Sequence, residues 1–192
     1  MIRKMEPERV IKSERVYEGT IISVRRDDVV VSKLDRGIPA FREVVEHSDA
    51  VVIVPMDKDG NILLVRQFRH AIGETLLEAP AGGVEKQEAP IEAAQRELRE
   101  ETGYRADRLI PLGNFWVAPG WTDEHMYAFM ASGLAPDRAD MDEDENIQVV
   151  PIPWQNVLEL IQCGEIRDAK TIAALLIAFG MQPTKISGNK VI

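Results

Sequence analysis

Three glutamates, Glu97, Glu100 and Glu101, have the spacing in this chain that most directly suggests chemistry. On an α-helix, residues three and four positions apart share a face, so these carboxylates would lie within an arc of about 100°. Like charges at such spacings repel each other by roughly a few tenths of a kcal/mol per pair in water. A divalent cation would reverse the sign of that interaction, and clustered carboxylate oxygens suit Mg²⁺ or Mn²⁺. The spacing therefore indicates a metal-binding face or a solvated acidic one.

The solvated interpretation treats the carboxylates as surface charge paired with arginines, for example Arg96 with Glu100 four residues later. An acidic helix face taken alone favours this interpretation. The helix itself is expected over about residues 90–102, because Pro90 suits a first turn and Gly103 suits a C-terminal cap. The choice between the two interpretations therefore depends on the residues around the glutamates.

Those surrounding residues resemble the Nudix box. The pattern is a glycine, five residues, a glutamate, seven residues, Arg-Glu, a bulky apolar residue, any residue, Glu-Glu, any residue, a glycine and a bulky residue. A chance match would occur on the order of 10⁻⁷ times per chain of this length. The pattern overturns the solvated interpretation, although an aliphatic residue is commoner than tyrosine at its last place. The matching positions are Gly82, Glu88, Arg96, Glu97, Leu98, Glu100, Glu101, Gly103 and Tyr104.

The resemblance implies the fold of a Nudix hydrolase, an α/β/α sandwich around a mixed β-sheet in the α+β class. It also implies metal-dependent cleavage of a diphosphate that links a nucleoside to another group. Bound metal ions would neutralise the diphosphate, polarise a phosphorus–oxygen bond and lower the pKa of the attacking water. The expected cofactor is Mg²⁺, for which Mn²⁺ can substitute.

The resemblance also assigns roles to the matched residues. Glu97 and Glu101 are expected to be direct, catalytic metal ligands, and Glu100 a ligand or a supporting carboxylate. Arg96 and Glu88 are expected to pair and hold the loop against the helix. The expected metal ligands are the main-chain carbonyl of Ala81 and the side chains of Glu97, Glu100, Glu101 and Glu145. The structural residues of the box are Gly82, Glu88, Arg96 and Gly103.

An acidic segment at residues 140–146 contains the expected general base. Taken alone, the segment is solvated negative charge before a strand. In the ADP-ribose pyrophosphatases, however, a glutamate on the equivalent loop swings over the metals and activates water. The alignment places that glutamate at Glu143, with Glu145 as an additional metal ligand. A slip of two residues would make Glu145 the base instead.

Motifs outside the box resemble those of the ADP-ribose and related nucleoside-diphosphosugar pyrophosphatases. Residues 78–82 resemble their Glu-X-Pro-Ala-Gly motif, and residues 118–124 resemble their Ser-Pro-Gly-Phe-Ser-Asp-Glu loop. Residues 65–69 and 164–171 match a strand end and the last helix–helix junction. The substrate-binding residues implied are Ile21, Arg42, His47, Arg69, Glu78, Pro119, Gly120 and Glu124. The alternatives are that Arg42 and Arg69 form surface ion pairs and that Glu124 caps its loop.

Composition excludes other classes of function. The 192 residues carry a net charge of −9, so a polyanion such as DNA would meet a repulsive field that no basic run offsets. The sequence has no stretch of 18 apolar residues that would span a membrane, and its one cysteine permits no internal disulfide. Composition therefore predicts a cytoplasmic protein that binds neither nucleic acid nor a membrane. The partner that the resemblance implies is a small nucleoside diphosphosugar.

The elements that must position these residues fall into three expected regions: N-terminal β-strands over 1–48, a Nudix domain over 49–181 and a flexible tail over 182–192. In the subfamily the N-terminal strands cross to a partner chain, so the resemblance implies a symmetric homodimer. Strands are expected at 21–24, 29–31, 41–45, 50–56, 62–67, 76–78, 109–117, 125–131 and 147–152. Loops or turns are expected at 25–28, 36–39, 57–61 (closing a hairpin) and 79–83, and later helices at 154–163 and 168–179.

The reaction implied is hydrolysis of ADP-ribose to AMP and ribose 5-phosphate, or of a related nucleoside diphosphosugar. One alternative is a pyrophosphatase for GDP-mannose or another nucleoside diphosphosugar. An alternative of a different class is a non-catalytic Nudix domain that senses ADP-ribose. The intact carboxylate set argues against the sensor, because a sensor can lose those ligands without penalty.

Overall fold

The computed structural model describes residues 6–33, 36–137 and 146–181. The chain divides into two compact units. The first comprises Met1–Ser48 with Trp116–Glu124, and the second comprises Asp49–Phe115 with His125–Ile192. None of the helices formed by the described residues combines the length and the hydropathy that a membrane-spanning helix needs.

The first unit contains a three-stranded antiparallel sheet in the order β1-β2-β3. Its strands are β1 (Arg9–Glu18), β2 (Ser23–Lys33) and β3 (Arg36–Glu46). The loop at 116–124 joins the end of β3, because the Val45 N–H donates to the carbonyl of Trp121 at 2.8 Å. The turn predicted at 36–39 is wrong, since these residues begin β3 and pair with β2. Pro39 fits there because β3 is an edge strand, on which a missing N–H is tolerated.

The loop predicted at 25–28 is also wrong, because β2 runs through it without interruption. Its charges are paired within the sheet. Arg25 donates to Asp27 and to Glu46, each at 3.0 Å, and the Ser13 hydroxyl donates to Asp27 at 2.6 Å. Charged residues that find partners on the same and neighbouring strands do not interrupt a strand.

The second unit contains two sheets. The first, in the order β10-β5-β6, is antiparallel, and the second, in the order β7-β4-β9-β8, is mixed, because β4 runs parallel to β9 and antiparallel to β7. The strands are β4 (Ala50–Pro55), β5 (Asn61–Arg69), β6 (Glu74–Glu78), β7 (Ala81–Gly83), β8 (Tyr104–Trp116), β9 (His125–Pro136) and β10 (Ile147–Pro153). The mixed sheet confirms the predicted α+β class.

The hairpin predicted around residues 57–61 is correct at the turn and at one antiparallel bridge, between Met56 and Ile62, but its pairing extends no further. The Asp57 carboxylate accepts hydrogen bonds from the N–H groups of Asp59 and Asn61, which closes the turn. Strands β4 and β5 nevertheless pair with other strands in different sheets. The loop predicted at 79–83 is wrong in its second half, because Ala81–Gly83 forms β7.

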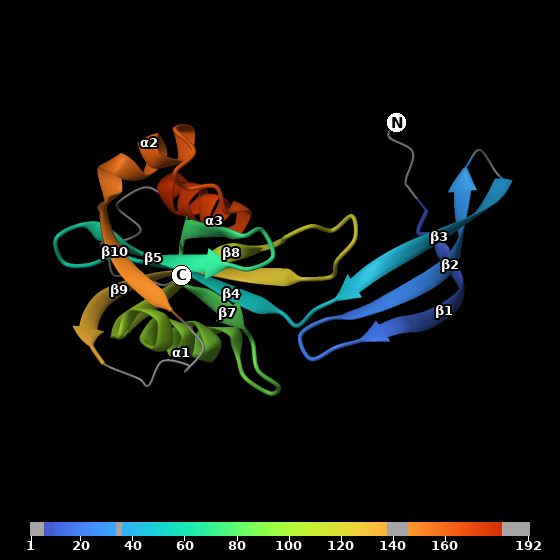
Figure 1. The fold of residues 1–192 in the computed structure, drawn as a ribbon, viewed down its shortest axis with the longest axis horizontal. Coiled ribbons are helices and arrows are strands. Elements are labelled where there is room, and N and C mark those ends of the chain that lie inside the picture. Colours follow the sequence, from blue (N-terminus) through green and yellow to red (C-terminus); the bar gives the residue numbers. More distant parts are fainter. Residues whose placement is uncertain (1–5, 34–35, 138–145, 182–192) are drawn as a thin grey trace. The chain divides into compact units, whose positions relative to one another are not determined.

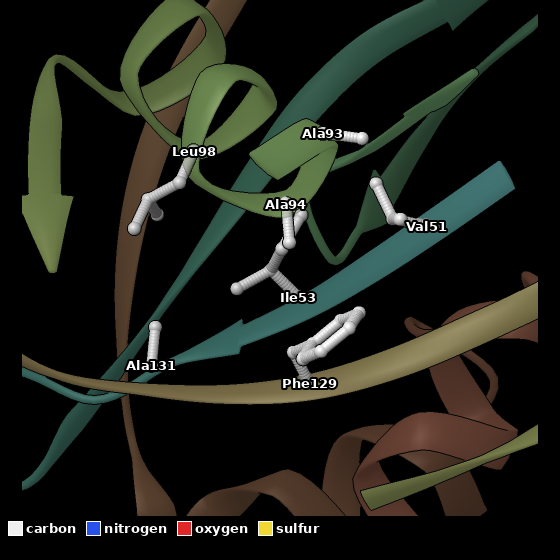
Figure 2. Packing of buried hydrophobic residues seen from close by; sticks show 7 residues of the cluster. All are labelled: Val51, Ile53, Ala93, Ala94, Leu98, Phe129 and Ala131. Atoms are coloured by element: carbon white, nitrogen blue, oxygen red, sulfur yellow. The ribbon is translucent and has the colours of Figure 1, made fainter. Parts of the chain in front are cut away.

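The helix predicted at 90–102 is confirmed as α1 (Pro90–Thr102), ended by Gly103 at φ 73°. Its apolar face packs on β4 and β9, and Figure 2 shows this cluster: Val51, Ile53, Ala93, Ala94, Leu98, Phe129 and Ala131. Helix α3 (Ala169–Gly180) lies on the opposite side of the sheets in Figure 1, with the predicted Asp168 as its N-cap. Trp154–Asn156 forms a 3₁₀ turn before α2 (Val157–Gln162), so the helix predicted at 154–163 begins later.

Candidate active site

Glu101 continues the apolar stripe of α1 formed by Ala94 and Leu98, and it is only 4% exposed. A carboxylate removed from water is costly unless hydrogen bonds compensate it. Here the main-chain N–H of Ala81 donates to Glu101 Oε2 at 3.2 Å. The packing of α1 therefore places the Glu101 carboxylate against strand β7.

Glu97 lies against the next residue of the same strand. A Cβ atom built on Gly82 would be 2.1 Å from both Cδ and Oε1 of Glu97, well inside van der Waals contact. The Glu97 carboxylate therefore occupies the space that any side chain at position 82 would need. Glu97 and Glu101 consequently contact consecutive residues of β7.

Replacing Gly82 by alanine tests this contact. The added methyl group must displace the Glu97 carboxylate. If Glu97 holds a metal ion, as the resemblance implies, kcat for hydrolysis of a nucleoside diphosphosugar should fall about 10- to 100-fold. Gly180→Ala is the control, because a Cβ there meets no atom within 4 Å. Steady-state kinetics with thermal unfolding checks the prediction, and equal kcat values for the two folded variants would contradict it.

Arg96 connects the carboxylates of α1 to the loop before the helix. Its Nε and Nη2 each donate to one carboxylate oxygen of Glu88 at 3.0 Å, and Nη2 also donates to the carbonyl of Gly83 at 2.8 Å. Its Nη1 donates to Glu97 at 2.7 Å and to Glu100 at 3.0 Å. The Arg96–Glu100 pair expected of a solvated helix is present, but as one part of a network that fixes three carboxylates.

Arg96 and Glu88 each stabilise the ionised form of the other. Hydrogen bonds from Arg96 lower the pKa of Glu88, and hydrogen bonding to Glu88 is the main reason why the pKa of Arg96 is raised. Both groups therefore stay ionised around neutral pH. The guanidinium is held in place beside Glu97 and Glu100.

A second charged cluster surrounds Glu78, which is 1% exposed. Arg69 donates to both of its carboxylate oxygens, at 2.9 and 2.8 Å, and Lys170 donates to one of them. Burial alone would raise the pKa of Glu78, but the hydrogen bonds from Arg69 and the charge of Lys170 outweigh it and lower that pKa. Lys170 was missed by the sequence reasoning, although it lies in the stretch 164–171 that resembles the subfamily's helix junction.

Glu78→Gln is expected to lower the free energy of unfolding by about 3 kcal/mol at pH 7, because two cations lose their buried counter-charge. The folded pKa of Glu78 is lowered, so its ionised form stabilises the protein above the ordinary glutamate pKa, and this contribution is lost as the pH falls through the folded value. The difference between wild type and variant should therefore shrink below about pH 4. Urea denaturation at several pH values measures it.

The matched control is Glu165→Gln, which breaks the exposed ion pair with Arg66. Exposed pairs contribute little, so the expected change at pH 7 is below about 1 kcal/mol. Equal losses in both variants, or a difference for Glu78→Gln that is independent of pH, would contradict the account of this cluster.

Six of the residues expected to bind substrate belong to the first unit, whereas the glutamates of α1, Arg69 and Glu78 belong to the second. Arg42 forms an exposed ion pair with Glu8, as its alternative interpretation proposed. Ile21 is 78% exposed. The six residues are Ile21, Arg42, His47, Pro119, Gly120 and Glu124.

The loop at 116–124 is ordered by its own hydrogen bonds. The N–H groups of Trp121 and Thr122 both donate to the carbonyl of Ala118 at 3.1 Å, which closes a turn over Pro119 and Gly120. The Glu124 N–H donates to the Thr122 hydroxyl at 3.2 Å, and the His47 N–H donates to Asp123 at 2.9 Å. The loop therefore presents Pro119, Gly120 and Glu124 from a defined backbone. Glu143 and Glu145, the expected base and additional ligand, lie outside the described residues.

The oxygen atoms that Glu97, Glu101 and the carbonyl of Ala81 offer are of the kind that a divalent cation such as Mg²⁺ binds. Among the described residues, no group of three or more acidic, histidine or cysteine side chains is assembled as a metal site. Two carboxylates, Glu97 and Glu101, meet one strand that also carries the main-chain carbonyl of Ala81. Mg²⁺ takes oxygen ligands and commonly keeps several waters, so one or two carboxylates can suffice to hold it. The close approach of the Glu97 carboxylate to Gly82 places one of these carboxylates directly on the strand.

The chain is similar to known proteins over most of its length. A family profile described as the NUDIX domain matches residues 46–175. The chain is 36% identical over 170 residues to an ADP-ribose pyrophosphatase of Bacillus subtilis (strain 168), covering 88% of this chain and 90% of the relative. It is 34% identical over 160 residues to a GDP-mannose pyrophosphatase of Yersinia pestis (strain Pestoides F), covering 76% and 79%. A crystal structure described as an ADP compounds hydrolase matches with a TM-score of 0.85 at 25% identity, covering 97% of this chain and 98% of that one.

Proposed function

Because this chain belongs to the NUDIX family, we propose that it hydrolyses the diphosphate bond of ADP-ribose, or of a related nucleoside diphosphosugar. For ADP-ribose the products are AMP and ribose 5-phosphate. The oxygen of one water forms a bond to one phosphorus while the bridging phosphorus–oxygen bond breaks. The base takes one proton of that water and releases it to the departing phosphate or to solvent. The other proton stays on the attacking oxygen as a hydroxyl of the new phosphate until that hydroxyl ionises.

The observation that carries this proposal is the meeting of Glu97 and Glu101 at consecutive residues of β7. The contact brings together two carboxylates that belong to a helix packed firmly on the core. Arg96 also holds Glu97 through a 2.7 Å hydrogen bond. Carboxylates held in place before the substrate binds need not reorganise when negative charge develops on the diphosphate during the reaction.

Nudix hydrolases generally use divalent metal ions, and Mg²⁺, with Mn²⁺ as a substitute, is the ion proposed here. When bound, such an ion neutralises the diphosphate and acidifies the attacking water. Glu97 and Glu101 would hold it with the carbonyl of Ala81, and Glu100 would act as a ligand or support one through Arg96. Arg96, paired with Glu88, keeps the carboxylates oriented.

Glu143 is the proposed general base, which accepts a proton from the attacking water. Glu145 is proposed as an additional metal ligand, and it becomes the base if the alignment slips by two residues. Arg69, which Glu78 holds by two hydrogen bonds, is a proposed contact for the diphosphate or the terminal ribose. The other proposed substrate contacts are Ile21, Arg42, His47, Pro119, Gly120 and Glu124.

The proposed assembly is a symmetric homodimer formed by the N-terminal strands. Large apolar side chains are exposed on β1 and β3 of the first unit, which supports an interface on these strands. Light scattering with size-exclusion chromatography tests this state. The proposed location is the cytoplasm, since a chain with one cysteine gains no internal disulfide from an oxidising compartment. The exposed side chains are Val10, Ile11, Val16, Tyr17, Ile38 and Phe41.

A panel of substrates tests the proposed function. ADP-ribose, GDP-mannose and other nucleoside diphosphosugars would be incubated with the protein and Mg²⁺, and phosphate would be measured after phosphatase treatment. Preference for ADP-ribose is the expected result. Preference for GDP-mannose would favour the second candidate, which the relative of that name supports. Binding of ADP-ribose without phosphate release from any compound would favour the sensor and contradict the proposal.

A further inference from the structure

Six consecutive residues, Glu78–Gly83, are each held by a separate contact. Helix α3 contacts the first two residues, of which Glu78 is also bound by Arg69 of β5, and α1 contacts the last three. The contacts are Glu78 with Arg69 and Lys170, Ala79 N–H with the Thr171 hydroxyl, the Pro80 carbonyl with Ile53 N–H, Ala81 N–H with Glu101, Gly82 with Glu97, and the Gly83 carbonyl with Arg96. The segment therefore links two helices that lie on opposite sides of the sheets in Figure 1.

Thr171 makes the most specific of the contacts from α3. Its side chain is fully buried, and its hydroxyl accepts the N–H of Ala79 at 2.8 Å. The hydroxyl proton is directed to Asp168 Oδ2 at 2.6 Å, and the same oxygen accepts the Thr171 N–H at 2.9 Å. Asp168 thus fixes the direction of the hydroxyl, which in turn fixes Ala79.

Lys170 acts on the preceding residue. Its ammonium group donates to Glu78 and lies 3.0 Å from Asp168 Oδ2. Asp168 therefore lies between the two contacts that α3 makes with the segment. Pro80 follows Ala79, and its ring holds φ near −65°, so the backbone between Ala79 and Ala81 has little freedom to absorb a displacement.

We propose that Asp168, Lys170 and Thr171 are positioning residues for the metal-binding strand. They set Glu78 and Ala79, and through Pro80 they determine where Ala81 and Gly82 meet Glu101 and Glu97. The inference rests on the proposed function for its consequence, since a displaced strand matters when Ala81 and the two glutamates hold a metal ion. Helix α3 lies on the far side of the sheets from α1, and in this proposal it helps to position the metal-binding strand.

The test is Mn²⁺ binding to the protein without substrate, measured by isothermal titration calorimetry. Thr171→Val keeps the shape of the side chain but removes the hydroxyl, and we expect Mn²⁺ affinity to fall about 10- to 100-fold, as for other groups that orient metal ligands. Thr171→Ser restores the hydroxyl and should restore most of the affinity. At saturating metal, the KM for ADP-ribose should remain close to that of wild type.

Two further variants separate positioning from loss of stability. Val157→Ala removes buried side-chain volume on α2, outside the segment, and should lower Tm without changing Mn²⁺ affinity. Lys170→Met removes one contact to Glu78 but leaves Arg69 in place, so its loss of affinity should be smaller than that of Thr171→Val. If Thr171→Val does not fold, the Mn²⁺ affinity of Lys170→Met still tests the proposal.

The outcomes distinguish this inference from the proposed function. Folded Thr171→Val or Lys170→Met with wild-type Mn²⁺ affinity would overturn the inference, even if the wild type hydrolyses ADP-ribose. Weakened Mn²⁺ binding in a protein that hydrolyses none of the tested compounds would support the positioning role and contradict the function. A wild-type protein that binds no Mn²⁺ would overturn the inference.

Discussion

Replacing Glu97 by glutamine is expected to lower kcat for ADP-ribose hydrolysis about 10³-fold, equivalent to about 4 kcal/mol of transition-state stabilisation. Glutamine has nearly the same shape, so the contact with Gly82 and the packing of α1 should remain. The variant loses the negative charge that would hold a divalent ion beside the diphosphate. Glu101→Gln should have an effect of similar size, because its carboxylate meets the same strand.

The control for both variants is Glu92→Gln. Glu92 lies on the exposed face of the same helix, where glutamine can still accept the Ala89 N–H, so the charge change is identical and the site is untouched. Its kcat should equal that of wild type at saturating Mg²⁺. Turnover by Glu97→Gln and Glu101→Gln within a fewfold of that of Glu92→Gln would remove the basis for assigning these carboxylates to a metal ion.

Replacing Glu143 by glutamine is expected to lower kcat by about 10³-fold, the range that a general base typically contributes. KM and the Mg²⁺ concentration needed for half-maximal activity should change little, because this residue is proposed to accept a proton and not to bind the metal. The measurement is steady-state kinetics over a range of Mg²⁺ concentrations with purified, folded protein.

Glu145→Gln is the matched comparison, with the same chemical change two residues later. As an additional metal ligand, Glu145 should mainly affect the Mg²⁺ requirement, and excess Mg²⁺ should recover much of the lost activity. If Glu145→Gln instead loses more activity than Glu143→Gln at saturating Mg²⁺, the base is Glu145 and the alignment is shifted by two residues.

Elements determined by local sequence could be predicted accurately. The helix over 90–102 was predicted at both ends, because Pro90 and Gly103 act within one turn of the helix. Asp168 was predicted as a cap for the same reason, and it does accept the Thr171 N–H. These features depend on residues that are close in the sequence, so they can be recognised from one sequence alone.

Strand pairing could not be predicted in the same way. The turn at 57–61 indicated a hairpin between the strands beside it, but apart from one bridge between Met56 and Ile62 these strands have other partners. Strand β4 pairs with β7 and β9, and β5 pairs with β6 and with β10, which lies about eighty residues later. Residues 25–28 looked like a loop because they are charged, and only the structure shows that Ser13 and Glu46 satisfy those charges. Partners so distant in sequence leave no local signal.

In the candidate site too, local features could be predicted from the sequence, and contacts between distant residues could not. The spacing of Glu97 and Glu101 identified the helix face, and the glycine at position 82 matched a known pattern, but the steric reason for that glycine required coordinates. The roles of Lys170 and Thr171 could not be derived from spacing, because their partners Glu78 and Ala79 lie about ninety residues earlier. Their position in a stretch that resembled the subfamily was the available signal.

The most direct test of the central claim is a crystal structure grown with Mn²⁺ and an ADP-ribose analogue whose bridging oxygen is replaced by a methylene group. Data collected near the manganese absorption edge would locate the ion by its anomalous scattering. We predict a peak within coordination distance of the carboxylates of Glu97 and Glu101 and of the carbonyl of Ala81, next to the analogue's diphosphonate. A bound analogue with no manganese peak beside these two glutamates, or with manganese held elsewhere, would contradict the account.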